Sequence, residues 1–247
     1  NDLWVRPDSP LLKHKGANPA YPDIFGTPED WKGKKILVTT VSTGHYALTA
    51  TLERLGLKDS DVDIVHMEQG QAMTAFNAGQ GDILQLWAPL SYVAEAKGWT
   101  RVSWGAAAKV MIAGGIGVRK EFAEQHPDLV VAWLDLYMRG VEGMKEHPEQ
   151  YVKPLLSYFN DYCGLELNED QVRMEFKYRP LFNVAEQIEA MENPDKLPAW
   201  VRGVADFMLA QGRIKKKEYD RYVQANFNID PSFMKKLAAL RAARGQK

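Results

Sequence analysis

Cysteine is almost absent from this chain, since Cys163 is the only one among 247 residues. A single thiol excludes an intrachain disulfide and any zinc or redox site built from paired cysteines. It fits the reducing cytosol, and it fits a cysteine-poor protein of the periplasm equally well. Cysteine content therefore leaves the cellular compartment undecided.

An excess of one charge is also lacking. Lys and Arg number 31 against 32 Asp and Glu, so the formal net charge is -1. This balance offers no electrostatic basis for binding nucleic acid or an anionic membrane surface. The run Lys215-Lys216-Lys217 is interpreted as an exposed helix start, and no nucleic-acid partner is expected.

Long hydrophobic runs are missing as well. No apolar run approaches the roughly 18 residues that a membrane-spanning helix requires. The longest, Val110–Val118, fits a buried strand instead. Neither a signal peptide nor a lipid-attachment cysteine is seen at Asn1, but a mature form or a fragment would look the same, so export is not excluded.

The first 31 residues contain five prolines, which favour extended and turn-rich backbone over helix. A short strand is predicted at Asp2–Arg6. A single helical turn is predicted after Thr27, because a hydroxyl residue followed by Pro28 and two acids is typical of a helix start.

From Lys35 on, the chain alternates short apolar runs with segments of helical periodicity. Strands are predicted at 35–40, 62–67, 82–87, 101–104 and 110–118, with helices at 44–55, 70–78 and 89–97. Strands separated by helices of this length predict a mostly parallel sheet with flanking helices, which is an α/β fold.

The character of the chain changes after Arg119, where only helical patterns remain. A short helix is predicted at 122–126, and a long helix from Pro127 carries a broad apolar stripe. Further helices are predicted at 148–162, 168–178, 184–192, 198–211, 216–224 and 231–244. Two regions follow from this change, an α/β region at 1–118 and a helical region at 119–247.

The most informative residues lie where the first of these strands meets its helix. Ser42, Thr43 and Gly44 stand at the predicted helix start, where unpaired N–H groups and the helix dipole favour an anion. The alternative is ordinary N-capping by a hydroxyl residue. His45 either donates a hydrogen bond to the anion or points into solvent.

A second strand-to-helix turn carries Gln69, Gly70 and Gln71, and a third strand ends at Trp87. The carboxyl ends of parallel strands meet at one edge of a sheet, so these residues are expected beside Ser42 and Thr43. The amides of the second turn either bind the ligand or belong to a simple capped turn. Trp87, on the same strand face as Gln85, either packs on an apolar part of a ligand or belongs to the core.

Catalytic arrangements are poorly represented. Ser42 and His45 are three residues apart on one helical turn, without the G-x-S-x-G pattern of a nucleophile elbow. His66 and Glu68 alternate on a strand without a third metal ligand nearby in sequence. Neither a catalytic site, a metal site nor a cofactor is therefore predicted.

Five blocks of the sequence carry a family likeness. They are W-K-G-K-K-I-L-V (31–38), V-S-T-G-H-Y (41–46), L-G-L-K-D-S-D-V-D-I-V (55–65), A-F-N-A-G-Q-G-D-I-L-Q-L-W-A-P (75–89) and G-V-R-K-E-F-A-E-Q-H-P-D-L-V (117–130). In their order and spacing they resemble the periplasmic substrate-binding proteins of ABC importers for nitrate, taurine and aliphatic sulfonates. The blocks cover about half of the chain.

This resemblance implies a type II periplasmic-binding-protein-like fold and a role without catalysis. The ligand would be a small organic anion, a sulfonate or a related compound, and closure of two lobes would bury it. The partners would be this solute and a membrane ABC permease. The location would be the periplasm, or the cell exterior with a membrane tether.

Members of the family begin with a further sheet, so the chain resembles a second lobe plus the C-terminal helices that pack on the first lobe. The expectation is a fragment, a separate chain that supplies the first lobe, or a protein that has lost it. Two alternatives to a binding protein remain: an enzyme of the same fold, as in thiamin pyrimidine synthesis, and an effector-binding domain of a transcription regulator.

Overall fold

The structure is a computed structural model that describes residues 1–245. The chain forms two compact units. The first comprises Asn1–Ile112 and Gly203–Lys215, and the second comprises Ala113–Arg202 and the described residues from Lys216 onward. Each unit is described by itself.

A single mixed sheet forms the centre of the first unit. Its strands are β1 (Asp2–Val5), β2 (Lys35–Val38), β3 (Asp63–His66), β4 (Ile83–Leu86) and β5 (Thr100–Trp104), in the order β3-β2-β4-β1-β5. β2 pairs in parallel with β3 and β4, whereas β1 is antiparallel to both β4 and β5. The predicted strands up to residue 104 are confirmed, and so is the mostly parallel sheet; the N-terminal strand is its one reversed member.

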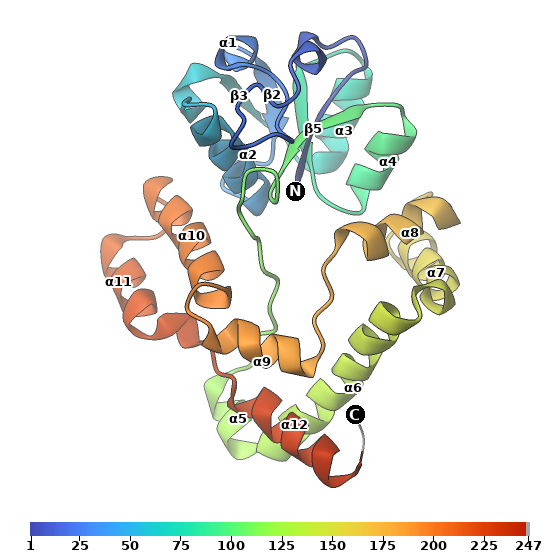
Figure 1. Ribbon diagram of the computed structural model, residues 1–247, viewed down its shortest axis with the longest axis vertical. Coiled ribbons are helices and arrows are strands. Elements are labelled where there is room, and N and C mark those ends of the chain that lie inside the picture. Colours follow the sequence, from blue (N-terminus) through green and yellow to red (C-terminus); the bar gives the residue numbers. More distant parts are fainter. Residues whose placement is uncertain (246–247) are drawn as a thin grey trace. The chain divides into compact units, whose positions relative to one another are not determined.

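Helices cover both faces of this sheet (Figure 1). On one face, α2 (Thr43–Arg54) buries Leu48 and Leu52 against Ile36 and Val38 of β2. The short α1 (Pro28–Trp31) adds the buried Trp31 to the same core. α3 (Gln69–Asn77) and α4 (Leu90–Ala96) cover the other face with apolar side chains that include Ala72, Phe76 and Ala94. Alternate strand residues point to opposite faces, so each strand contributes to both cores.

The helix boundaries follow the predicted signals closely. Thr27 caps α1 through a reciprocal pair of hydrogen bonds with Asp30, so the predicted single turn is confirmed. α2 and α3 are each followed closely by a glycine with positive φ, Gly56 at 73° and Gly79 at 85°. Glycine adopts this backbone conformation without steric cost, which lets the chain leave the helix and enter the next strand.

The strand predicted at Val110–Val118 is wrong. In the described chain, residues 110–119 pair with no strand, and the side chains of Ile116 and Val118 are 53% and 47% exposed. A turn after β5 directs the backbone away from the sheet, and the three glycines at 114, 115 and 117 leave few side chains to pack on one. The apolar run therefore forms an extended segment, and the boundary between the two units lies within it.

The second unit is helical, as predicted. It contains α5 (Lys120–Gln125), α6 (Pro127–Glu146), α7 (Pro148–Ser157), the π-helical turn η3 (Tyr158–Tyr162), α8 (Glu169–Tyr178), α9 (Val184–Glu192), α11 (Lys216–Gln224) and α12 (Ser232–Ala243). α10 (Leu197–Ala210) begins in this unit and ends in the first. No helix of residues 1–245 combines the length and the apolar character needed to cross a membrane.

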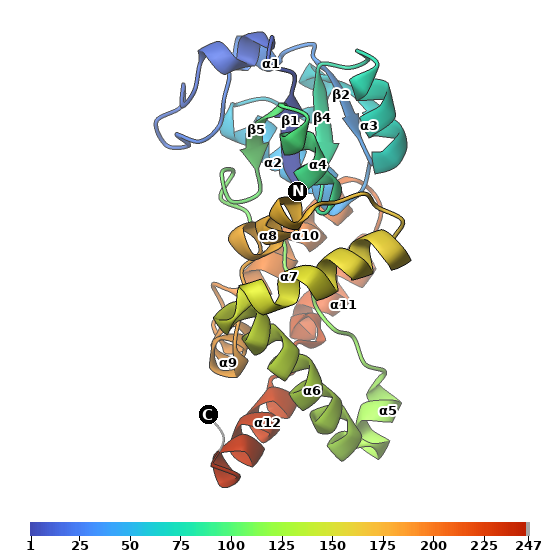
Figure 2. The same ribbon diagram turned by 90° about the vertical axis from the view of Figure 1, so that its right-hand side faces the viewer.

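The core of the second unit lies where α6 packs against α9 and α12 (Figure 2). Val131 and Met138 of α6 meet Met234 and Leu237 of α12. A buried ion pair joins the same two helices: Arg241 donates to Asp135 at 2.8 Å and to Glu142 at 2.7 Å. Burial alone would lower the pKa of Arg241, but the bonds to these two carboxylates raise it above its ordinary value.

Candidate functional site

The candidate site begins where β2 ends and α2 starts. Ser42 is the N-cap of α2: its Oγ accepts hydrogen bonds from the N–H groups of Gly44 at 3.1 Å and His45 at 3.2 Å. The same hydroxyl donates to the carbonyl of Thr39 at 2.6 Å. The Ser42 side chain therefore builds the turn, and it already occupies two N–H groups of the first helical turn.

His45 lies inside the first unit, where only 4% of the residue is exposed. Its Nδ1 accepts a hydrogen bond from the N–H of Val41 at 3.1 Å, and its Nε2 lies 3.1 Å from Asp59 Oδ2. Because Nδ1 accepts, a neutral ring carries its proton on Nε2 and donates it to Asp59. Val41 holds a φ of 54°, which is rare for a β-branched residue and marks a constrained loop.

Asp59 collects hydrogen bonds from several elements of the first unit. Besides His45, it accepts from Thr49 at 2.9 Å and from Gln211 Nε2 at 3.2 Å. Burial alone would raise the pKa of Asp59, but these hydrogen bonds outweigh burial and hold the pKa below its ordinary value. The Phe207 ring meets His45 edge-on at 5.2 Å between centroids, so residues 203–215 help to fix the start of α2.

Gly44 permits a close approach between α2 and β4. A Cβ atom at this position would lie 2.2 Å from the amide carbon and oxygen of Gln85. Gln85 is 1% exposed, and within the described chain neither its Oε1 nor its Nε2 has a hydrogen-bond partner. Sequence reasoning did not assign Gln85 to the site, although a polar residue in the apolar run I-L-Q-L-W was a visible signal.

The second predicted turn is joined to the end of β4. Oε1 of Gln69, the first residue of α3, accepts a hydrogen bond from the N–H of Trp87 at 2.6 Å. Trp87 is half-buried and follows β4, before the cis peptide bond between Ala88 and Pro89. This contact brings two predicted site segments together at the carboxyl edge of the sheet.

The remaining predicted residues lie at the two helix starts. Gly70 and Gln71 are exposed in the first turn of α3. Thr43 is partly buried, and its hydroxyl donates to Asn1 Oδ1 at 3.4 Å. His66 accepts from the N–H of Thr40 at 3.1 Å, which ties the end of β3 to the same loop. The edge therefore combines the ends of β2, β3 and β4 with the starts of α2 and α3.

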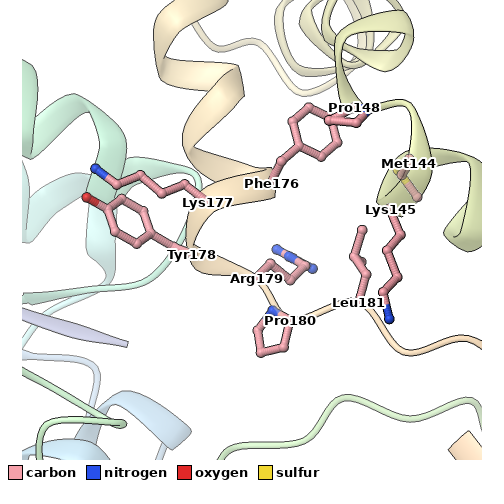
Figure 3. Close-up of a pocket in the computed structure, with 9 residues that line it drawn as sticks. All are labelled: Met144, Lys145, Pro148, Phe176, Lys177, Tyr178, Arg179, Pro180 and Leu181. Carbon is pink, nitrogen blue, oxygen red and sulfur yellow. The ribbon is translucent and has the colours of Figure 1, made fainter. Parts of the chain in front are cut away.

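The concavities described next lie away from this edge. One, of about 370 Å³, lies in the second unit, and its lining includes Phe176, Arg179 and Lys145. Its basic residues are engaged, because Arg179 binds Glu175 with two bonds of 3.0 Å and Lys145 binds Glu186. Figure 3 shows Lys177 and Tyr178 directed away from Phe176. The second, of about 520 Å³, lies at the C-terminal end of α2 and, like the first, includes no predicted site residue.

Metal-ligating side chains do not gather in the described part of the chain. Across residues 1–245, no group of three or more His, Cys, Asp or Glu residues is arranged to hold a metal ion. His66 and Glu68, which sequence analysis examined as metal ligands, form a pair 3.9 Å apart at the exposed end of β3. The chemistry available at the strand edge is thus hydrogen bonding, helix-dipole attraction and contact with an aromatic ring.

Comparison with known proteins relates the chain to one family. The sequence model of the family described as NMT1/THI5 like matches residues 23–151, just over half of the chain. The taurine-binding periplasmic protein of Escherichia coli is 32% identical over 210 residues, which are 81% of this chain and 63% of the relative. A periplasmic binding protein assigned to an ABC transporter in Brachyspira hyodysenteriae is 28% identical over 95% of this chain and 65% of its own length. The chain thus spans slightly less than two thirds of these relatives.

Solved structures show the same fold. The periplasmic aliphatic sulphonate binding protein SsuA of Escherichia coli superposes with a TM-score of 0.64 at 19% identity, over 87% of this chain and 62% of that chain. The desulfurization enzyme DSZB superposes with a TM-score of 0.55 at 15% identity, over 97% of this chain and 76% of that chain. The fold therefore occurs in a binding protein and in an enzyme.

Proposed function

The chain belongs to the NMT1/THI5-like family, and on this premise we propose that it is a solute-binding component of an ABC importer that captures a small organic anion. The favoured ligand is a sulfonate or a related compound, since relatives are named for taurine and for aliphatic sulfonates. One relative is named as an ABC transporter periplasmic binding protein and another as a taurine-binding periplasmic protein, and these names favour binding over catalysis.

The observation that carries the proposal is the meeting of two helix starts and two strand ends at one edge of the sheet. The hydrogen bond from Trp87 to Gln69 joins the start of α3 to the end of β4, and Gly44 brings the start of α2 against the same strand. Ligands of open α/β sheets bind at such an edge, and helix N-termini favour anions there.

Each predicted residue takes a role in this site. Ser42 holds the turn as a cap, and the exposed first turn of α3 supplies Gly70 and Gln71 as donors to the anion. Thr43 provides an N–H and a hydroxyl at the start of α2. Trp87 supplies an apolar wall for the carbon part of the ligand. His45 does not contact the ligand in this proposal; its buried ring holds the loop before α2 by accepting a hydrogen bond from the N–H of Val41.

The partners and the location follow from the same proposal. The anionic solute would be delivered to a membrane permease, and the protein would work in the periplasm or tethered outside the cell. In this proposal a first lobe, in this polypeptide or in a separate chain, closes over the strand edge and completes the enclosure of the ligand.

Calorimetric titration of the 247-residue chain with alkanesulfonates, taurine, nitrate and small carboxylates tests the proposal. We expect heat with at least one sulfonate and a roughly tenfold loss of affinity for Gln71→Ala, which is the size of effect of one hydrogen bond to a charged group. Gln80→Ala is the matched control, since Gln80 is exposed just beyond the other end of the same helix. Absence of heat with every compound, both for this chain alone and with a first lobe supplied, would refute the proposal.

A second candidate is an enzyme on the same fold, favoured by the similarity to DSZB over 97% of this chain. The likeness concerns the fold alone. Turnover of a sulfonate or sulfinate by the purified chain, or release of sulfite from it, would favour this candidate over binding. Stoichiometric binding without product formation would favour the importer component.

A further inference from the structure

The pocket of about 370 Å³ in the second unit differs in chemistry from the strand edge. It lies where the ends of α6 and α8 meet the start of α7, and its lining residues all belong to the second unit. Its volume falls within the range of roughly 300–1,000 Å³ that small-molecule sites occupy. The eight predicted ligand residues belong to the first unit, so a site in this pocket is independent of the proposed function.

Apolar side chains form much of the pocket wall. Met144 of α6, Pro148 of α7, Phe176 of α8 and Leu181 line it, and each of them is only partly buried. Figure 3 shows the Phe176 ring directed toward Pro148. Binding is favoured when a ligand removes such partly exposed apolar groups from water. The wall therefore suits a ligand with an apolar body.

The charged side chains beside this wall already have partners of opposite charge. Arg179 binds Glu175 through two hydrogen bonds of 3.0 Å, and Lys145 forms an ion pair with Glu186. The two bonds fix the orientation of the guanidinium, while 58% of the Arg179 side chain stays exposed. A planar guanidinium stacks on aromatic rings. These pairs thus offer a stacking surface to a neutral ring, without a net charge that would attract an ion.

Both helices that end at the pocket are followed by a proline at the position of a backbone donor. In an α-helix the carbonyl of residue i accepts a hydrogen bond from the N–H of residue i+4. For Met144 that position is Pro148, and for Phe176 it is Pro180; proline has no N–H to donate. All four residues line the pocket. Each helix therefore ends there with a carbonyl that lacks its usual helical partner.

The N–H groups just before these prolines do not replace the missing donors. His147 donates its N–H to the carbonyl of Gly143 at 2.8 Å, and Arg179 donates its N–H to the carbonyl of Glu175 at 3.0 Å. The two carbonyls at the pocket therefore keep their capacity to accept, and they lie at the negative ends of two helix dipoles. An N–H donor on a ligand suits this position, whereas an anion does not.

We propose that the pocket binds a small, neutral, planar aromatic compound that carries an N–H donor. The ring packs on the Phe176 side chain and the Arg179 guanidinium, and its N–H donates to the carbonyl of Phe176. A ring of the same shape without the N–H would cover this carbonyl and leave it unpaired, which lowers affinity. The ligand class is thus distinct from that of the strand edge, where helix N-termini favour an anion.

An NMR titration of the complete 247-residue chain with indole and with benzofuran tests this proposal. The two compounds have nearly the same shape, but benzofuran has an oxygen in place of the N–H. We expect saturable shifts of backbone amides around the pocket and a Kd about fivefold lower for indole, which is the size of effect of one neutral hydrogen bond. Benzofuran binding as tightly as indole would overturn the proposal, because a surface that is only apolar does not distinguish them.

Pro180→Ala changes the carbonyl acceptor and leaves the wall in place. It introduces an N–H that can donate to the carbonyl of Phe176, so the preference for indole should fall to within about twofold. Pro154→Ala is the matched control, because Pro154 lies exposed inside α7 and outside the pocket. It introduces an N–H for the carbonyl of Gln150 and should keep the fivefold preference. An unchanged preference in Pro180→Ala would overturn the proposal.

Phe176→Leu tests the aromatic wall. We expect both compounds to bind about fivefold more weakly, since the ring contact is lost, while the preference for indole remains. Tyr158→Leu removes an exposed ring of η3 outside the pocket and should change neither affinity. Unaltered indole binding in Phe176→Leu, or no saturable shift in the wild type with either compound, would overturn the proposal. Neither result bears on the strand edge, which the sulfonate titration tests separately.

Discussion

His45 and Asp59 show how a residue can shape a site from inside the fold. The imidazole fastens the constrained loop at Val41, and Asp59 holds the imidazole from its other side. Thr49 and Gln211 hold Asp59 in turn. The start of α2 is therefore positioned by a chain of hydrogen bonds that ends in a segment more than 150 residues away in sequence.

Replacement of Asp59 by Asn should make the free energy of unfolding less dependent on pH in the acid range. The pKa of Asp59 in the folded state is below its ordinary value of 3.8. The ionised carboxylate therefore stabilises the fold at pH values above 3.8. This contribution is lost as the pH falls through the lowered pKa. At pH 7 we expect Asp59→Asn to lower the free energy of unfolding by about 1–2 kcal/mol. Below about pH 4 the difference from the wild type should shrink.

Urea unfolding between pH 7 and pH 3 measures this difference. Asp63→Asn is the matched control, because Asp63 is exposed on β3 and its carboxylate lies 3.8 Å from Lys35. An exposed pair of this kind contributes little, so the control should change stability by less than about 0.5 kcal/mol. A pH-independent loss in Asp59→Asn would contradict the expected role of its carboxylate.

Sequence reasoning placed residues at the strand edge correctly wherever the signal was local. Ser42, Thr43 and Gly44 could be predicted from the strand-to-helix pattern, and the structure shows the capping bonds that this pattern allows. Gln85 and Asp59 could not be placed in this way. Their positions depend on the packing of β4 and of residues 203–215 against α2, which no spacing in the sequence reveals.

At the scale of elements, Arg241 is the polar residue on which the packing of α12 against α6 most depends. Its side chain is 9% exposed and faces two carboxylates, Asp135 and Glu142. Removal of the arginine from a buried ion pair leaves its carboxylate partners buried without a compensating positive charge. The helix pair should therefore be sensitive to loss of this one guanidinium.

Arg241→Met should lower the free energy of unfolding of the second unit by about 3–5 kcal/mol. Arg244→Met, one turn later on an exposed position, is the control and should change it by less than about 0.5 kcal/mol. Circular dichroism during urea unfolding reports the loss of helix in both variants. Equal stability of the two variants would show that the apolar core alone holds α12.

The predicted elements succeeded where helical spacing and terminal signals agreed, and failed where an apolar run stood alone. α9 and α11 match the predicted ranges, because apolar spacing and terminal signals agree there. The run Val110–Val118 failed, since a short apolar run cannot be distinguished from an extended connection by pattern alone. Whether such a run becomes a strand depends on the path of the backbone after β5, and here the chain leaves the outer edge of β5 unpaired.

At the scale of the whole molecule, the described residues form two separate apolar cores in the first unit and one in the second. The first unit holds the cores on the two faces of the sheet, and the second holds the core of α6, α9 and α12. All eight predicted ligand residues belong to the first unit. The proposed function therefore predicts that a bound ligand stabilises the two units unequally.

Hydrogen exchange with and without a bound sulfonate tests this prediction. At a free ligand concentration of about 100 times Kd, binding to the folded state adds about 2.7 kcal/mol of stability. We expect slower exchange for amides of β2, β4 and α2, whose opening requires the site to unfold, and unchanged exchange for amides of α6 and α12. In Arg241→Met, exchange in α6 and α12 should accelerate while the protection by ligand in β2 and β4 persists. Equal slowing in both units would instead mean that the ligand engages residues of the helical unit, so that the strand edge is only part of the site.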